Sequence, residues 1–125
     1  MSVSVKVIGV FRAATDTRDV PDGTVIFEEG SSGEEMFGVI EGTVELRLSN
    51  GRVITLGPDD TFGEMALVDS SARSATAVAV GECKLAVIDR NRFLWLVGET
   101  PRFALHVMAS LADRLREAQS QIAEG

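Results

Sequence analysis

The stretch Phe62-Gly63-Glu64-Met65-Ala66-Leu67, followed after five residues by Arg73-Ser74-Ala75-Thr76-Ala77-Val78-Ala79, is the most informative part of the sequence. A glycine and an acid precede a short apolar turn, and nine positions after the acid an arginine stands in a run of small residues. A carboxylate near a helix start accepts hydrogen bonds from ribose hydroxyls, while free helix N–H groups and an arginine hold a phosphate. The spacing therefore predicts a site for a sugar-linked phosphate.

This segment resembles the phosphate-binding cassette of cyclic-nucleotide-binding domains, as in protein kinase A regulatory subunits, the bacterial catabolite activator protein and cyclic-nucleotide-gated channels. The resemblance extends to residues 23–30, which are similar to the family's early strand and glycine turn, and to residues 36–44, which are similar to its next two strands. Asp59 departs from the pattern because a glycine is common there, and we expect this change to affect a surface turn. We expect the front of the chain to lack the full helical lead-in of many members.

The resemblance implies that Arg73 pairs with the cyclic phosphate and that Glu64 accepts a hydrogen bond from the ribose 2′-hydroxyl. Either residue alone would be an ordinary surface charge, but together at this spacing they favour a ligand site. Leu46 and Val53 stand where the family places apolar contacts to the purine, although buried hairpin residues would look the same. The expected ligand-binding residues are Phe62, Gly63, Glu64, Met65, Ala66, Leu67, Arg73, Ser74, Ala75, Thr76, Leu46 and Val53.

The sequence leaves open which nucleotide base is bound and which residue of the last helix covers it. Ser74 either assists phosphate or guanine binding, as in some relatives, or is an ordinary serine at a strand start; for Thr76, packing is the alternative to a place in the site. In the family the last helix moves over the base, and a side chain from it acts as a lid. The sequence does not choose among the lid residues Met108, Leu111, Leu115 and Arg114.

Composition bounds the class of protein. The 125 residues, of which 45% are apolar and 25% charged, fit one soluble domain. The net charge of −7 disfavours nucleic acid and anionic membranes as partners. Cys83 has no second cysteine with which to form a disulfide, and neither a membrane-spanning run nor a good signal peptide is present. A cytoplasmic location is expected.

Alternating apolar residues and turn signals predict a β-rich first part. Val3, Val5 and Val7 indicate a strand, and residues 12–14 a turn of helix. Asn50-Gly51 is typical of a tight hairpin. Further strands are predicted at 24–27, 36–40, 44–48, 52–56, 74–80 and 84–88, with turns at Pro21-Asp22-Gly23, Glu41-Gly42, Gly57-Pro58-Asp59-Asp60 and Gly81-Glu82. The expected fold is mainly β: an antiparallel β-barrel or jelly roll (double-stranded β-helix) over about 1–88, with the cassette at 62–76, followed by two α-helices.

The two helices are expected at 89–97 and 101–123. Asp89 is a good N-cap, Gly98 ends the first helix, and Thr100-Pro101 starts the second. The second carries an apolar stripe that indicates either packing against its own domain or, less often, a dimer seam: Ala104, Met108, Leu111, Leu115, Ala118 and Ile122. Trp95 with Phe93 is expected to anchor the first helix, and His106 to lie on a helix surface.

The leading functional hypothesis is a stand-alone regulatory module, residues 1–125, that binds cAMP, or else cGMP, and signals to a protein effector by movement of its last helix. The alternative is a structural or interaction domain that binds no ligand and forms a homodimer or docks a partner through that helix. No enzyme is expected because no nucleophile, base and orienting acid form a recognisable motif. No metal is expected either, since His106 has no second ligand at suitable spacing.

Overall fold

The computed structural model describes residues 16–69 and 71–124, with the side chains to Glu117. Its elements are β1 (Asp16–Val20), β2 (Val25–Phe27), β3 (Glu35–Arg47), β4 (Val53–Leu56), β5 (Thr61–Phe62), α2 (Met65–Val68), β6 (Thr76–Asp89), α3 (Arg90–Glu99) and α4 (Arg102–Glu124). The predicted strand at Val3 to Val7 and the helical turn at 12–14 lie outside the described residues. None of the described helices is long and apolar enough to cross a membrane.

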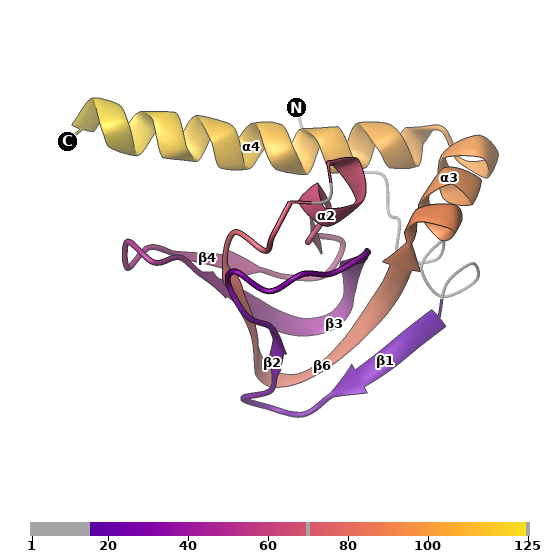
Figure 1. Cartoon of the computed structure of the whole chain (residues 1–125), viewed down its shortest axis with the longest axis horizontal. Coiled ribbons are helices and arrows are strands. Elements are labelled where there is room, and N and C mark those ends of the chain that lie inside the picture. The colour runs from indigo at the N-terminus through magenta and orange to yellow at the C-terminus, as the bar shows by residue number, and fades with distance from the viewer. Residues whose placement is uncertain (1–15, 70, 125) are drawn as a thin grey trace.

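The strands form one antiparallel sheet built around β3 and β6. Its order is β1-β6-β3-β4, with β2 also paired to β6 and β5 to β3. Both long strands curve strongly, so that the sheet wraps around an interior, and α4 runs along one side of it (Figure 1). The predicted antiparallel β-structure followed by two helices is confirmed, as is the hairpin at Asn50-Gly51, where Arg47 pairs with Val53.

Two predicted turns are wrong. Glu41-Gly42 does not end a strand, because β3 continues to Arg47, and Gly81-Glu82 does not interrupt β6. The register with β6 shifts on both sides of Glu41, and Gly42 has a φ of 96°. A bulge with a glycine at positive φ bends a strand without ending its pairing, and in sequence it resembles a turn.

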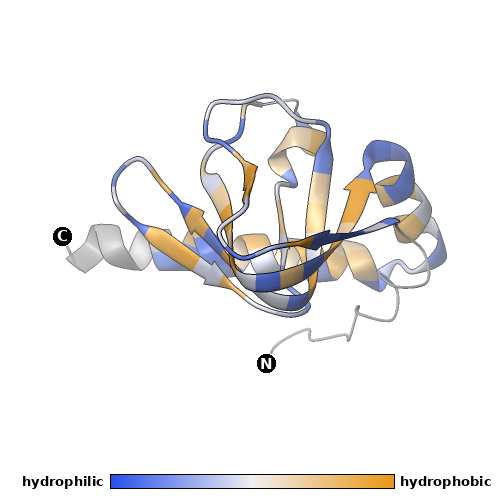
Figure 2. Ribbon diagram, turned by 90° about the horizontal axis from the view of Figure 1, so that it is seen from below, coloured by the Kyte–Doolittle hydropathy of each residue, from blue (hydrophilic) through white to orange (hydrophobic). Residues whose placement is uncertain are grey.

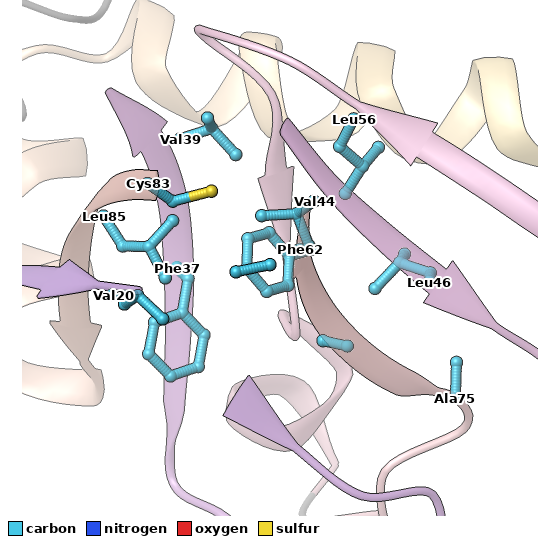
Figure 3. Packing of buried hydrophobic residues seen from close by; sticks show 12 residues of the cluster. Val20, Phe37, Val39, Val44, Leu46, Leu56, Phe62, Ala75, Cys83 and Leu85 are labelled. Carbon is cyan, nitrogen blue, oxygen red and sulfur yellow. The ribbon is translucent and has the colours of Figure 1, made fainter. Parts of the chain in front are cut away.

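The core has two parts. Inside the curved sheet, the stacked rings of Phe37 and Phe62, 5.3 Å apart, lie among aliphatic side chains such as Val44 (Figure 3). On the outer side of the sheet, the start of β3 and the end of β6 pack against the helices, where Leu96 and Phe103 are fully buried. Successive residues are therefore buried at 36–40 of β3, whereas hydrophobic and hydrophilic residues alternate further along, at 44–47 (Figure 2). The inner part supports the cassette, because Phe62 directly precedes Gly63 and Glu64.

The helices begin near the predicted positions. Asp89 caps α3, because its carboxylate accepts a hydrogen bond of 2.7 Å from the Arg92 amide. The predicted packing stripe of α4 is wrong in part: Met108 and Leu115 are 57% and 59% exposed, whereas Leu111 packs as predicted, together with Phe103 and Val107. The reason is that Phe103, buried against α3, sets the rotation of the helix. Ala118 and Ile122 lie beyond the described side chains.

Two further side chains differ from expectation. Trp95 is 48% exposed, so the anchor of α3 is Phe93, whose ring packs against Phe103 at a centroid distance of 5.7 Å. His106 is not on the surface but buried, and its Nε2 contacts the carbonyl oxygen of Asp59. Asp59 thus lies in a turn, as predicted, but that turn is fastened to α4.

Candidate functional site

A cavity of about 160 Å³ opens between the cassette, the β3–β4 hairpin and α4. Its walls are mostly aliphatic, and its charged lining groups are one carboxylate and two guanidinium groups among the described residues. The lining consists of Phe27, Leu46, Leu48, Ile54, Gly63, Glu64, Met65, Ala66, Ala72, Arg73, Ser74, Ala75, Leu111 and Arg114. An aliphatic pocket with a few convergent charges is the usual form of a small-molecule site.

Arg73 is hydrogen-bonded through both its main chain and its side chain. Its amide donates to the carbonyl of Ser31 and its carbonyl accepts from the amide of Gly30, both at 2.8 Å. Its Nη1 donates to the carbonyl of Gly63 at 3.0 Å, and its Nη2 to the carbonyl of Glu35 at 2.8 Å. The side chain is only 7% exposed, so the guanidinium is a buried, oriented cation.

The space around this guanidinium is narrow. A Cβ atom at Gly33 would lie 2.4 Å from Nη2, and one at Gly63 would lie 2.8 Å from Nη1. Gly63 also has a φ of 80°, which L-residues rarely adopt. Both glycines therefore allow the arginine to lie against the main chain.

The side chain of Arg73 is a buried cation whose hydrogen-bond donors are not all paired. Burial lowers the pKa of the guanidinium, while the carboxylates of Glu35 and Glu64 act in the opposite direction. Arginine starts from so high a value that it remains a cation at neutral pH. Its Nε is buried and has no hydrogen-bond partner within the described part of the chain. Leaving a buried donor unpaired costs free energy of folding. An unpaired N–H next to a cavity therefore indicates a place where a ligand can supply the acceptor.

Glu64 is also buried, at 5% exposure, but it already has a partner. Arg114 of α4 donates through Nη2 to Oε1 of Glu64 and through Nη1 to the carbonyl of Thr61, the latter at 3.0 Å. The ion pair therefore joins α4 to the start of α2, which lies beneath the middle of that helix (Figure 1). Any group that competes for Glu64 also acts on α4.

The structure brings most of the predicted site residues to this cavity: Gly63, Glu64, Met65, Ala66, Arg73, Ser74, Ala75 and Leu46. The other four do not line it. Phe62 and Leu67 are buried in the core, and the Thr76 hydroxyl accepts a hydrogen bond from the Glu29 amide. Val53 is 50% exposed and points away, because its hairpin neighbour Ile54 takes the inward position in the alternation.

Sequence reasoning missed Phe27, Leu48, Ile54 and Ala72 as lining residues. Leu48 has the same strand parity as the predicted Leu46, so the alternation could have indicated it. Phe27 gave no signal, since its place beside Arg73 depends on the pairing of β2 with β6. Of the lid residues, Leu111 and Arg114 line the cavity, whereas Met108 and Leu115 are exposed and do not.

Comparisons with known proteins agree with this geometry. Residues 17–100 match the model of the cyclic nucleotide-binding domain family. Over 107 residues the chain is 39% identical to the cyclic AMP receptor protein of Thermus thermophilus, covering 82% of this chain and 50% of that protein. The crystal structure of the Thermus thermophilus catabolite activator protein superposes with a TM-score of 0.77 at 34% identity, covering 96% of this chain and 59% of that one. A structure from a cyclic-GMP-dependent signalling pathway in bacterial phytopathogenesis superposes with a TM-score of 0.79 at 28% identity, covering 90% of this chain and 94% of that one.

The chain belongs to the cyclic nucleotide-binding domain family, of the type found in the catabolite activator protein and in protein kinase A regulatory subunits. Domains of this family are typically regulatory and not catalytic. The chain spans about half the length of the curated relatives it matches.

Proposed function

We propose that this chain is a regulatory module, one domain over residues 1–125, that binds a cyclic nucleotide in the cavity and transmits binding through α4. The observation that supports this best is Arg73, a buried cation held by two carbonyls, with an unpaired Nε beside an aliphatic cavity. A phosphate oxygen would supply the acceptor that this guanidinium lacks. Glu64 would accept the ribose hydroxyl, and Leu46, Leu48 and Ile54 would contact the base.

The aliphatic wall favours cAMP over cGMP. Adenine carries one exocyclic amine, whereas guanine carries a carbonyl, a ring N–H and an exocyclic amine, and each polar group buried without a partner costs about 1 to 3 kcal/mol. Among the described lining residues the hydroxyl of Ser74 is the nearest match for such groups, and Ser74 is exposed. If the Ser74 hydroxyl hydrogen-bonds to guanine, Ser74→Ala will lower the affinity for cGMP alone. A lower affinity for both nucleotides would mean that the hydroxyl contacts the phosphate.

Binding is tested by calorimetric titration of the protein with cAMP and with cGMP. Arg73→Ala should abolish the heat, and Arg73→Lys, which keeps the charge but not the planar fork, should weaken binding by about tenfold or more. Arg47→Ala is the matched control, because Arg47 is an exposed arginine paired with Glu45 on the surface. Binding that survives in Arg73→Ala, with circular dichroism unchanged, would contradict the proposal.

Signalling would proceed through the pair of Glu64 and Arg114. A ribose hydroxyl that hydrogen-bonds to Glu64 competes with Arg114, so the ligand has a different affinity for the two positions of α4. Hydrogen exchange of residues 102–117 measures this: ligand should change their protection in the natural protein and leave it nearly unchanged in Arg114→Ala. Equal ligand responses in both proteins would rule out this route.

One observation favours the second candidate function, association through α4. Leu105, Met108 and Leu115 are 53%, 57% and 59% exposed and are spaced by three and seven residues, as in a helix-pairing seam. Sedimentation velocity should then show a dimer that Met108→Glu with Leu115→Glu converts to a monomer. A monomeric natural protein would remove this candidate without affecting ligand binding.

A further inference from the structure

The ring of Phe27 lies against the cation of the site. The guanidinium carbon of Arg73 is 4.2 Å from the centroid of this ring, whereas the ring of Phe37 is 5.9 Å away. Phe27 is the last residue of β2, is half-buried and lines the cavity. A cation this close to an aromatic ring is attracted by the quadrupole of the ring.

The carbonyl contacts alone do not fix the guanidinium. They hold Nη1 at Gly63 and Nη2 at Glu35, which leaves the plane free to tilt about the line through these two nitrogens. A ring against the guanidinium removes that freedom. The ring is itself held, with centroid distances of 6.0 Å to Phe37 and 5.9 Å to Phe62. The direction in which Nε points is therefore set by an aromatic wall that belongs to the core.

The ring also stabilises the buried charge without using any N–H group. A carboxylate in the same place would accept hydrogen bonds from the guanidinium and so compete with an incoming phosphate. An aromatic face offsets part of the cost of burial by cation–π attraction and leaves the donors of Arg73 free for a ligand.

We propose that Phe27 is a positioning residue of the anion site: its ring aligns the guanidinium of Arg73 so that the unpaired N–H groups face the bound phosphate. This inference rests on the proposed function for its effect on affinity. The alignment itself is a property of the ligand-free protein, so it can be measured separately.

The test compares Phe27→Leu and Phe27→Tyr with the natural protein. Binding of cAMP is titrated directly, and binding of adenosine, which has no phosphate, is measured by competition. Phe27→Leu should weaken cAMP binding by about fivefold to tenfold and leave adenosine unchanged, while Phe27→Tyr should restore cAMP binding to within about twofold. Phe93→Leu, which truncates a half-buried phenylalanine of the other cluster, should change unfolding temperature but neither affinity.

In the ligand-free protein, the NMR signal of the Arg73 Nε–H should show a ring-current shift in the natural protein and in Phe27→Tyr, and lose it in Phe27→Leu. Equal losses of cAMP and adenosine binding in Phe27→Leu would overturn the inference, because they would mean that the ring contacts the nucleoside. An unchanged Arg73 signal would overturn it as well. If the natural protein binds neither cyclic nucleotide, the proposed function fails, and the NMR comparison still decides whether Phe27 aligns Arg73.

Discussion

A single methyl group at Gly33 is expected to disable the site while leaving the fold intact. The φ of Gly33 lies outside the positive range, so alanine is compatible with its main chain. The added Cβ would meet Nη2 of Arg73 at 2.4 Å and Cζ and Nε at 2.8 Å, although real Cβ contacts essentially never fall below 3.0 Å. The guanidinium must therefore shift away from residue 33.

The size of the effect follows from the bonds that are lost. The displaced guanidinium gives up its two carbonyl contacts and its stacking on Phe27. Two charge-assisted hydrogen bonds to a phosphate, at about 1.5 kcal/mol each, correspond to an affinity loss of about a hundredfold. The free energy of unfolding should fall by only about 1 to 2 kcal/mol, because the freed guanidinium is hydrated.

Calorimetric titration with cAMP and urea denaturation measure the two quantities for Gly33→Ala. Gly57→Ala is the matched control, because a Cβ at Gly57 would meet nothing within 4 Å and its φ is also outside the positive range. Gly57→Ala should bind as the natural protein does. If Gly33→Ala binds cAMP within about twofold of the control, the narrow space around Arg73 does not position it for a phosphate, and the reasoning is refuted.

Two further predictions concern stability. Asp89→Ala should lower the free energy of unfolding by about 1 kcal/mol through loss of the α3 cap, with Asp89→Asn nearly neutral in the same urea titration; equal losses would implicate charge instead of capping. Asp59→Gly should raise the unfolding midpoint by an amount equivalent to about 0.5 to 1 kcal/mol, because Asp59 has a φ of 77°; a lowered midpoint would mean that its side chain contributes more than this strain costs.

The family and the cassette were predictable because their signal is local. Gly63, Glu64 and Arg73 lie within eleven residues, and their types follow directly from the chemistry of a sugar-linked phosphate. The glycine at residue 33 could not be linked to Arg73, because forty residues separate them and the contact depends on how the loop before β3 packs. Long-range register decides such contacts, and no pattern within either segment encodes it.

A local sequence pattern is ambiguous where it fits both a bend within a strand and a turn between strands. Glu41-Gly42 and Asn50-Gly51 both pair a polar residue with glycine, yet the first bends β3 and the second ends it. The difference lies in β6, which pairs with β3 on both sides of Glu41. The rotation of α4 was similarly undecided, because its sequence offers two apolar faces and the burial of Phe103 selects between them.

The charges that line the cavity also predict what kind of phosphate it selects. Glu64 is neutralised by Arg114, so Arg73 remains as the uncompensated charge among the described lining residues. A cyclic phosphodiester is a monoanion and matches it, whereas the monoester of AMP carries a charge of about −1.5 to −2 at neutral pH. The surplus negative charge would have no second unpaired cation among the described lining residues, in a protein of net charge −7.

We therefore expect AMP to bind at least about tenfold more weakly than cAMP, although both carry the same base and sugar. Lowering the pH toward 6 should narrow the difference, because the monoester then takes up a proton and approaches a monoanion. Competition titrations of cAMP against AMP at pH 6 and pH 8 measure this. If the ratio of the cAMP and AMP affinities does not change with pH, the site does not discriminate by ligand charge. The geometry of the ring phosphate alone would then explain the weaker binding of AMP.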